Sequence, residues 1–104
     1  MFRNKVKQKA IREGKYRQIV ALLSEEFDWD DVVEESAITV LMARDGKFDQ
    51  SFEYIVDQPM MAQFRLKWAD GHLRVAYYPF SSINWEKEAR AERLTERIRE
   101  IEDA

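Results

Sequence analysis

Apolar residues recur at helical spacing in the first quarter of the chain. Tyr16, Ile19, Leu23 and Phe27 lie three or four positions apart, which is the spacing of one face of an α-helix. The pattern therefore predicts a helix from about residue 15 to residue 27.

The residues before this helix follow the same spacing less well. Phe2, Val6 and Ala10 lie four apart, but their side of the helical wheel is rotated away from the later apolar face. Gly14 separates the two stretches and indicates a break. Basic residues at an N-terminal end also oppose the helix dipole. We therefore expect residues 1–13 to form a basic arm with marginal helicity.

After a loop expected at residues 28–35, four runs of alternating or continuous apolar residues are typical of β-strands. Two of the gaps between these runs contain Asp-Gly, at Asp45-Gly46 and at Asp70-Gly71. This dipeptide between apolar runs is the strongest short-range signal of a hairpin. The pattern predicts a four-stranded antiparallel meander, with strands at about residues 37–44, 48–56, 61–69 and 72–78.

The two Asp-Gly turns also predict the register of their hairpins. A two-residue turn at Asp70-Gly71 makes the facing pairs on one side of the hairpin apolar: Trp68 with Leu73, Leu66 with Val75, and Phe64 with Tyr77. In the first hairpin, a three-residue loop with a left-handed Gly46 aligns Val40 with Phe52, so we expect a bulged loop there. The first strand is apolar on both faces, which indicates that both are covered.

The last fifth of the chain has the pattern of a charged helix. Neither glycine nor proline follows Asn84, whose side chain is suited to an N-cap, and Glu86 and Glu88 fall in the first turn. A narrow apolar seam runs along this helix, formed by Trp85, Ala89, Leu94, Ile98 and Ile101. The predicted fold is a single α+β domain of residues 1–104, with an N-terminal helix or helices, the four-stranded meander and a long C-terminal helix.

Composition supports one core and limits the chemistry. Of the 104 residues, 45% are hydrophobic and 12% aromatic, enough to bury a core without a metal or a disulfide. Cysteine is absent, so disulfides, thiolate metal sites and cysteine nucleophiles are excluded and a reducing compartment is expected. The longest apolar runs fall far short of the ~20 residues of a membrane helix. We expect a cytoplasmic protein without membrane contact.

The residues that commonly carry catalysis are sparse and poorly placed. The single histidine, His72, follows a turn and has no nucleophile motif nearby, so we interpret it as a surface residue. Asp49 and Glu53 would lie about 13 Å apart along a strand, wider than the roughly 5–9.5 Å of a glycosidase pair. The acidic run after residue 24 lacks the glycine of an EF-hand, and no phosphate-binding glycine loop occurs. We predict no catalytic residue, cofactor or metal.

The outward face of the second hairpin is the most specific surface. The predicted register places Lys67 opposite Arg74, with Arg65 and Tyr78 on the same face. Facing like charges cost stability, so an anion is needed there. Glu53 or Asp49 on the neighbouring strand is one source of that charge. Phosphate or nucleic acid, with help from the basic arm, is the other.

The charges along the chain are unevenly distributed. Residues 1–18 contain seven basic residues and one acidic residue, a net charge of +6, whereas residues 24–36 contain seven acidic and no basic residues. Such surfaces attract each other within one chain or between two chains. Together with the apolar edge strand and the narrow helical seam, they predict a homodimer whose contact includes Val40, Leu41, Leu94, Ile98 and Ile101.

The function predicted from these features is a small, non-enzymatic binding or adaptor protein that acts through protein contacts. Its partners would be a second copy of the chain and a further protein. The alternative is a nucleic-acid-binding module that uses Arg65, Lys67, Arg74, Tyr78 and the basic arm, with weak and salt-sensitive binding. A carboxylate-based enzyme is the third possibility.

Overall fold

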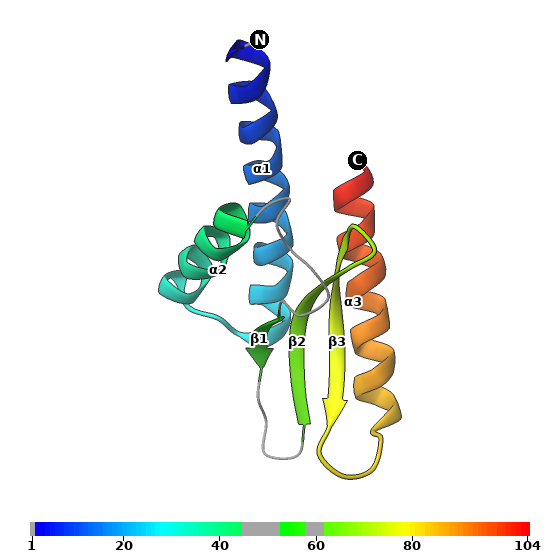
Figure 1. Cartoon of the computed structure of the whole chain (residues 1–104). Coiled ribbons are helices and arrows are strands. Elements are labelled where there is room, and N and C mark those ends of the chain that lie inside the picture. Colours follow the sequence, from blue (N-terminus) through cyan, green and yellow to red (C-terminus); the bar gives the residue numbers. More distant parts are fainter. Residues whose placement is uncertain (1, 45–52, 58–61) are drawn as a thin grey trace. The chain divides into compact units, whose positions relative to one another are not determined.

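The computed structural model of the chain describes residues 2–44, 53–57 and 62–104 (Figure 1). These residues belong to two compact units, Met1–Lys47 and Phe48–Ala104. The first unit contains two helices, and the second contains a small antiparallel sheet and a helix. The general prediction of an α+β chain with helices at both ends is therefore confirmed, but the four-stranded meander is wrong.

In the first unit, α1 is one continuous helix from Phe2 to Phe27. The predicted break at Gly14 is wrong. The residues around this glycine are mostly lysine, arginine and glutamine, which are strong helix formers, and a single interior glycine costs only about 1 kcal/mol. The residue that follows the helix is Asp28, whose left-handed φ of 59° is typical of the residue that closes a helix.

The second helix, α2, spans Asp31–Arg44, where the sequence pattern predicts a loop and then the first strand at 37–44. Both predictions are wrong. The apolar residues that appear to cover two faces of a strand also fit one side of a helix, because Ala37, Ile38 and Leu41 are all buried. Asp30 caps this helix, since its Oδ1 accepts a hydrogen bond from the amide of Val33 at 2.8 Å.

The two helices pack against each other. The apolar face predicted for residues 15–27 is confirmed, because Tyr16, Ile19, Val20 and Leu23 are all buried. Arg17 forms an exposed ion pair with Glu35 of α2 at 3.1 Å, which contributes at most about 1 kcal/mol. This unit is therefore held together mainly by apolar packing.

The sheet of the second unit has the order β1-β2-β3, and all its strands are antiparallel. Its strands are β1 (Glu53–Asp57), β2 (Ala62–Ala69) and β3 (His72–Pro79). The hairpin register is confirmed at each predicted apolar pair. Asp70 and Gly71 both have positive φ, 54° and 78°, as a two-residue hairpin turn requires. Gly46 and its predicted bulge lie outside the described residues.

The last helix, α3, spans Trp85–Asp103 and lies along β3 (Figure 1). Asn84 is the predicted N-cap, and its Oδ1 accepts hydrogen bonds from the amides of Glu86 and Lys87 at 3.1 and 3.2 Å. The predicted seam is partly wrong, because Ala91 is buried while Ala89 and Trp85 are exposed. The core of this unit consists of Phe64, Leu66, Leu73, Val75, Ala91, Leu94 and Ile98.

Candidate functional site

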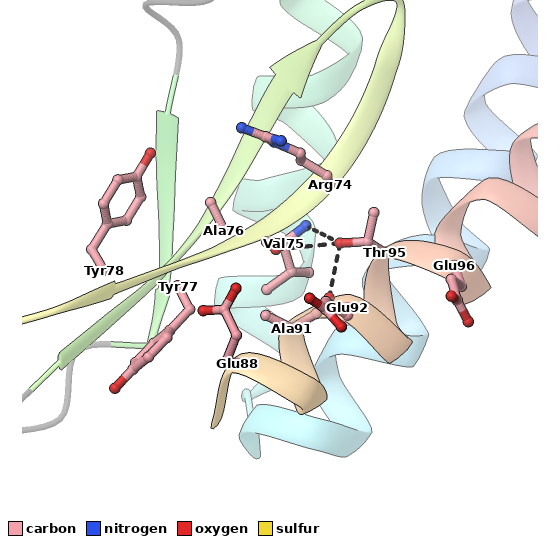
Figure 2. A pocket seen from close by; sticks show the side chains of 10 residues that line it. All are labelled: Arg74, Val75, Ala76, Tyr77, Tyr78, Glu88, Ala91, Glu92, Thr95 and Glu96. Carbon is pink, nitrogen blue, oxygen red and sulfur yellow. Dashed lines mark hydrogen bonds between the residues drawn. The ribbon is translucent and has the colours of Figure 1, made fainter. Parts of the chain in front are cut away.

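A groove follows the outer edge of β3 beside α3, with a volume of about 490 Å³ (Figure 2). Its polar lining comes from both elements: Arg74, Tyr77 and Tyr78 from the strand, and Glu88, Glu92 and Glu96 from the helix. In the described part of the sheet, β3 pairs only with β2. Alternate residues of β3 therefore direct their main-chain groups away from the sheet and toward this groove.

Two side chains of α3 cover part of this edge. Thr95 Oγ1 accepts a hydrogen bond from the amide of Val75 at 3.0 Å, and its own proton can go to the carbonyl of Val75 or to that of Ala91 (Figure 2). Nearer the turn, Glu102 Oε2 accepts a hydrogen bond from the amide of Leu73 at 3.3 Å. An added strand cannot pair with these two residues while the side chains occupy the edge.

The next outward position is Tyr77, and its edge is not covered in this way. Its main chain makes no hydrogen bond to a side chain within residues 2–44, 53–57 and 62–104. The tyrosine ring is fixed, because its centroid lies 5.4 Å from that of Phe64 and its hydroxyl accepts a hydrogen bond from the amide of Asn84 at 3.2 Å. As far as the described residues show, the groove thus contains a rigid segment of strand whose main-chain groups at Tyr77 are open.

Three carboxylates line the helical wall of the groove. Glu88, Glu92 and Glu96 are four residues apart, so they lie along one side of α3. Among the described residues, none of their carboxylates forms a hydrogen bond or an ion pair, and like charges at this spacing repel one another. Arg74 also lines the groove but does not form an ion pair with them. The wall therefore favours a bound positive charge.

The four residues of the predicted basic face occupy neighbouring positions on β2 and β3. The register pairs Lys67 with Arg74, Arg65 with Ala76 and Gln63 with Tyr78, which puts Arg65, Lys67, Arg74 and Tyr78 on one face. The structure brings Arg74 and Tyr78 into the lining of the groove as well. Sequence reasoning found these residues, but it missed the three glutamates opposite them.

Arg65 is held in place by its own neighbours. Its Nε donates a hydrogen bond to Gln63 Oε1 at 2.9 Å, its Nη2 donates to the same oxygen, and its guanidinium lies 4.9 Å from the centre of the Tyr78 ring. The register also pairs Glu53 with Lys67. Glu53 is one of the two positions predicted to supply a counter-charge. Asp49, the other position, lies outside the described residues.

His72 is half-buried rather than simply on the surface, because it lies against the last turn of α3. Its Nδ1 is 3.6 Å from Glu102 Oε1, and this nitrogen has no hydrogen-bond partner in the described structure. Burial raises the pKa of Glu102, while the hydrogen bond from the amide of Leu73 and the nearby His72 act in the opposite direction. The sequence offered no signal for this pair, which is separated by thirty positions.

We expect the Glu102→Gln variant to lose part of the pH dependence of stability. The raised pKa means that the carboxyl of Glu102 stays protonated in the folded state at pH values above 4.5, the ordinary pKa of a glutamate. Its contribution to stability is then full below pH 4.5 and declines as the pH rises through the folded-state pKa, by at most about 1.4 kcal/mol per pH unit. Glutamine can still accept the hydrogen bond from Leu73.

The measurement is chemical unfolding of both proteins between pH 4 and pH 8. The unfolding free energy of the wild type should fall relative to that of the variant as the pH rises above 4.5. A difference that is constant over this range would show that Glu102 does not titrate differently in the folded state. Glu100→Gln, which changes an exposed residue of the same helix, serves as the control.

The residues predicted for a dimer contact lie in different surroundings. Leu41, Leu94 and Ile98 are buried, whereas Val40 and Ile101 are half-buried. The predicted edge strand that motivated part of this contact is a helix, so that reason no longer applies. Homodimer formation itself stays a prediction.

Within the part of the chain that the structure describes, no cluster of three or more acidic or histidine side chains is arranged to hold a metal ion. None of the described helices combines the length and the apolar character needed to cross a membrane. Comparison of the chain with models of known families, with curated proteins and with solved structures gives no match.

Proposed function

We propose that this chain is a non-enzymatic binding protein whose β3–α3 groove holds a basic, extended segment of a partner protein. The observation that carries the proposal is the open main chain of Tyr77 beside the carboxylates of Glu88, Glu92 and Glu96. An extended segment could form main-chain hydrogen bonds with the strand and place cations near the helix. Because cysteine is absent, we expect this role in a reducing compartment such as the cytoplasm.

The spacing of the three glutamates along α3 favours a partner segment that carries a cation at every second residue. Side chains on one side of an extended segment repeat about every 6.6 Å, at 3.3 Å per residue. The three glutamates repeat every four residues of helix, which is about 6 Å. Lysine or arginine at every second position of the segment would thus match the carboxylates one for one.

The main-chain contact would be short. Thr95 already bonds to Val75, and Pro79, the next outward residue after Tyr77, lacks an amide proton. Only Tyr77 can therefore offer a full pair of main-chain groups. Affinity would come mostly from the charges, so we expect binding to be modest and to weaken as salt is added.

We expect a short synthetic peptide of alternating lysine and threonine to bind the wild-type protein. Binding should shift the amide resonance of Tyr77 in the NMR spectrum. The Glu92→Gln variant should bind this peptide roughly two- to five-fold more weakly, because one exposed ion pair is lost. The matched control is Glu100→Gln, which removes the same charge from α3 outside the groove.

Two outcomes would contradict the proposal. Equal loss of affinity in both variants would show that the peptide responds only to net charge. Equal binding of a peptide with glutamate in place of lysine would show that the carboxylates play no part.

Nucleic-acid binding is the second candidate, and the confirmed register favours it by placing three cations on one side of the sheet. The bonds of Arg65 to Gln63 and its stacking on Tyr78 occupy part of this face. Binding of duplex DNA that survives high salt and is lost in Arg74→Glu would support this candidate over the peptide groove.

A further inference from the structure

The outward side of α1 carries a regular seam that the first unit leaves exposed. Its members are spaced alternately by four and three residues: Lys7, Ile11, Gly14, Gln18, Ala21 and Glu25. All are exposed except Gly14, which is half-exposed, and Ile11 retains 50% of its accessible surface. Tyr16, Ile19 and Leu23 are buried on the other side of the helix. An alternating spacing of four and three is that of helices that pair lengthwise.

Gly14 has no packing role among the residues that the structure describes. A glycine inside a helix costs about 1 kcal/mol relative to alanine. A Cβ atom added at Gly14 would meet nothing within 4 Å, so packing among the described residues does not require a glycine at this position. A close approach by a second backbone is a common reason for glycine at such a position.

The two ends of the seam carry opposite charges. Lys7 lies near the basic end of α1, and Glu25 lies near its acidic end. The distance between them along the helix is about 27 Å, at 1.5 Å per residue. Neither residue forms an ion pair in the described part of the chain. A second α1 aligned in the opposite direction would bring Lys7 of each copy to Glu25 of the other.

We propose that α1 pairs with α1 of a second copy in antiparallel orientation through this seam. The two-fold axis then crosses the seam at the height of residue 16 along the helix, so that Ile11 packs on Ala21 of the other copy and Gly14 faces its Gln18. The small residues let the two helices approach closely, at the lower end of the usual 8–10 Å. A parallel pair would instead place Lys7 against Lys7, which is unfavourable.

This dimer is independent of the groove in the second unit. It uses only residues of α1, whereas the peptide site uses β3 and α3. It gives the binding protein two copies of its groove. Failure of either proposal would leave the other intact, because the dimer is measured by the mass in solution and the groove is tested by peptide binding.

The first measurement is the mass of the full chain by light scattering at low and high salt. We expect twice the 12.5 kDa of one chain at low salt and a shift toward the single-chain mass as salt screens the ion pairs. A single-chain mass at every concentration and salt would overturn the proposal.

Charge reversal tests the antiparallel orientation. Lys7→Glu or Glu25→Lys alone turns two attractive pairs into repulsive ones, so the dimer should weaken roughly ten- to thirty-fold. The double variant Lys7→Glu/Glu25→Lys reverses both partners and should regain the dimer. Lys5→Glu is the matched control, because it makes the same change of charge on a different side of α1 and should have little effect. Failure of the double variant to recover would overturn the orientation.

Gly14→Leu separates loss of pairing from loss of folding. Because a Cβ atom at this position meets nothing within 4 Å and leucine favours a helix more than glycine does, the helix should become more stable, and circular dichroism should confirm that it is folded. We expect the same variant to be monomeric, because the leucine would push the second helix away. A Gly14→Leu protein that is both helical and fully dimeric would exclude a contact at this position.

Discussion

Replacing Phe64 with alanine should lower the free energy of unfolding by about 3–5 kcal/mol. Phe64 is 1% exposed, and its ring packs at 5.4 Å from that of Tyr77 on the neighbouring strand. The guanidinium of Arg90 on α3 lies 5.8 Å from the centre of the same ring. The side chain thus joins the sheet to the helix, and its removal would leave a cavity between them. A loss of this size is a large part of the stability of a typical domain.

Equilibrium unfolding in urea, followed by tryptophan fluorescence, would measure this loss. The matched control is Phe80→Ala, because Phe80 keeps 53% of its surface exposed and its removal should change stability by less than about 1 kcal/mol. Similar losses in the two variants would show that Phe64 does not occupy the core.

The second hairpin and the last helix could be predicted because their signals are local. Asp70-Gly71 supplies two residues that tolerate positive φ, and the turn length then fixes which side chains face each other. Asn84 provides the cap that starts α3. In both places, a few neighbouring residues determine the structure, so it can be predicted without knowledge of distant contacts.

The segment at 37–44 could not be predicted because its pattern fits two structures. A run that is apolar at most positions satisfies both the two-residue period of a buried strand and the period of a helix. The cap at Asp30 and the packing of α2 on α1 favour the helix. The packing of α2 on α1 joins residues that are distant in sequence, and it overrides the strand preference of Ile38, Thr39 and Val40.

The candidate groove was beyond sequence reasoning for a related reason. Its edge is defined by bonds from Thr95 and Glu102 to strand residues 20 and 29 positions away. The sequence does contain a signal, because Glu88, Thr95 and Glu102 recur every seven residues on one side of α3. Only the docking of the helix on β3 shows that this side faces a strand edge.

Because α3 packs on β3, we expect a substitution at Ile98 to affect the stability of one chain and not the association of two. The sequence pattern places Ile98 in a dimer contact, so that Ile98→Glu would separate two chains. In the structure the side chain is 0% exposed. We therefore expect Ile98→Glu to lower the free energy of unfolding by more than about 4 kcal/mol, because it removes an apolar contact and buries a carboxylate without a partner.

Ile98→Val is the control, with an expected loss of only about 0.5–1.5 kcal/mol. Urea unfolding of both variants, together with NMR resonances of the β2–β3 hairpin, distinguishes the two roles of Ile98. Loss of the native hairpin resonances in Ile98→Glu alone would establish a core position. A folded Ile98→Glu protein with native hairpin resonances and a reduced mass would contradict it, because only a residue that faces a second chain could accept the charge without unfolding its own.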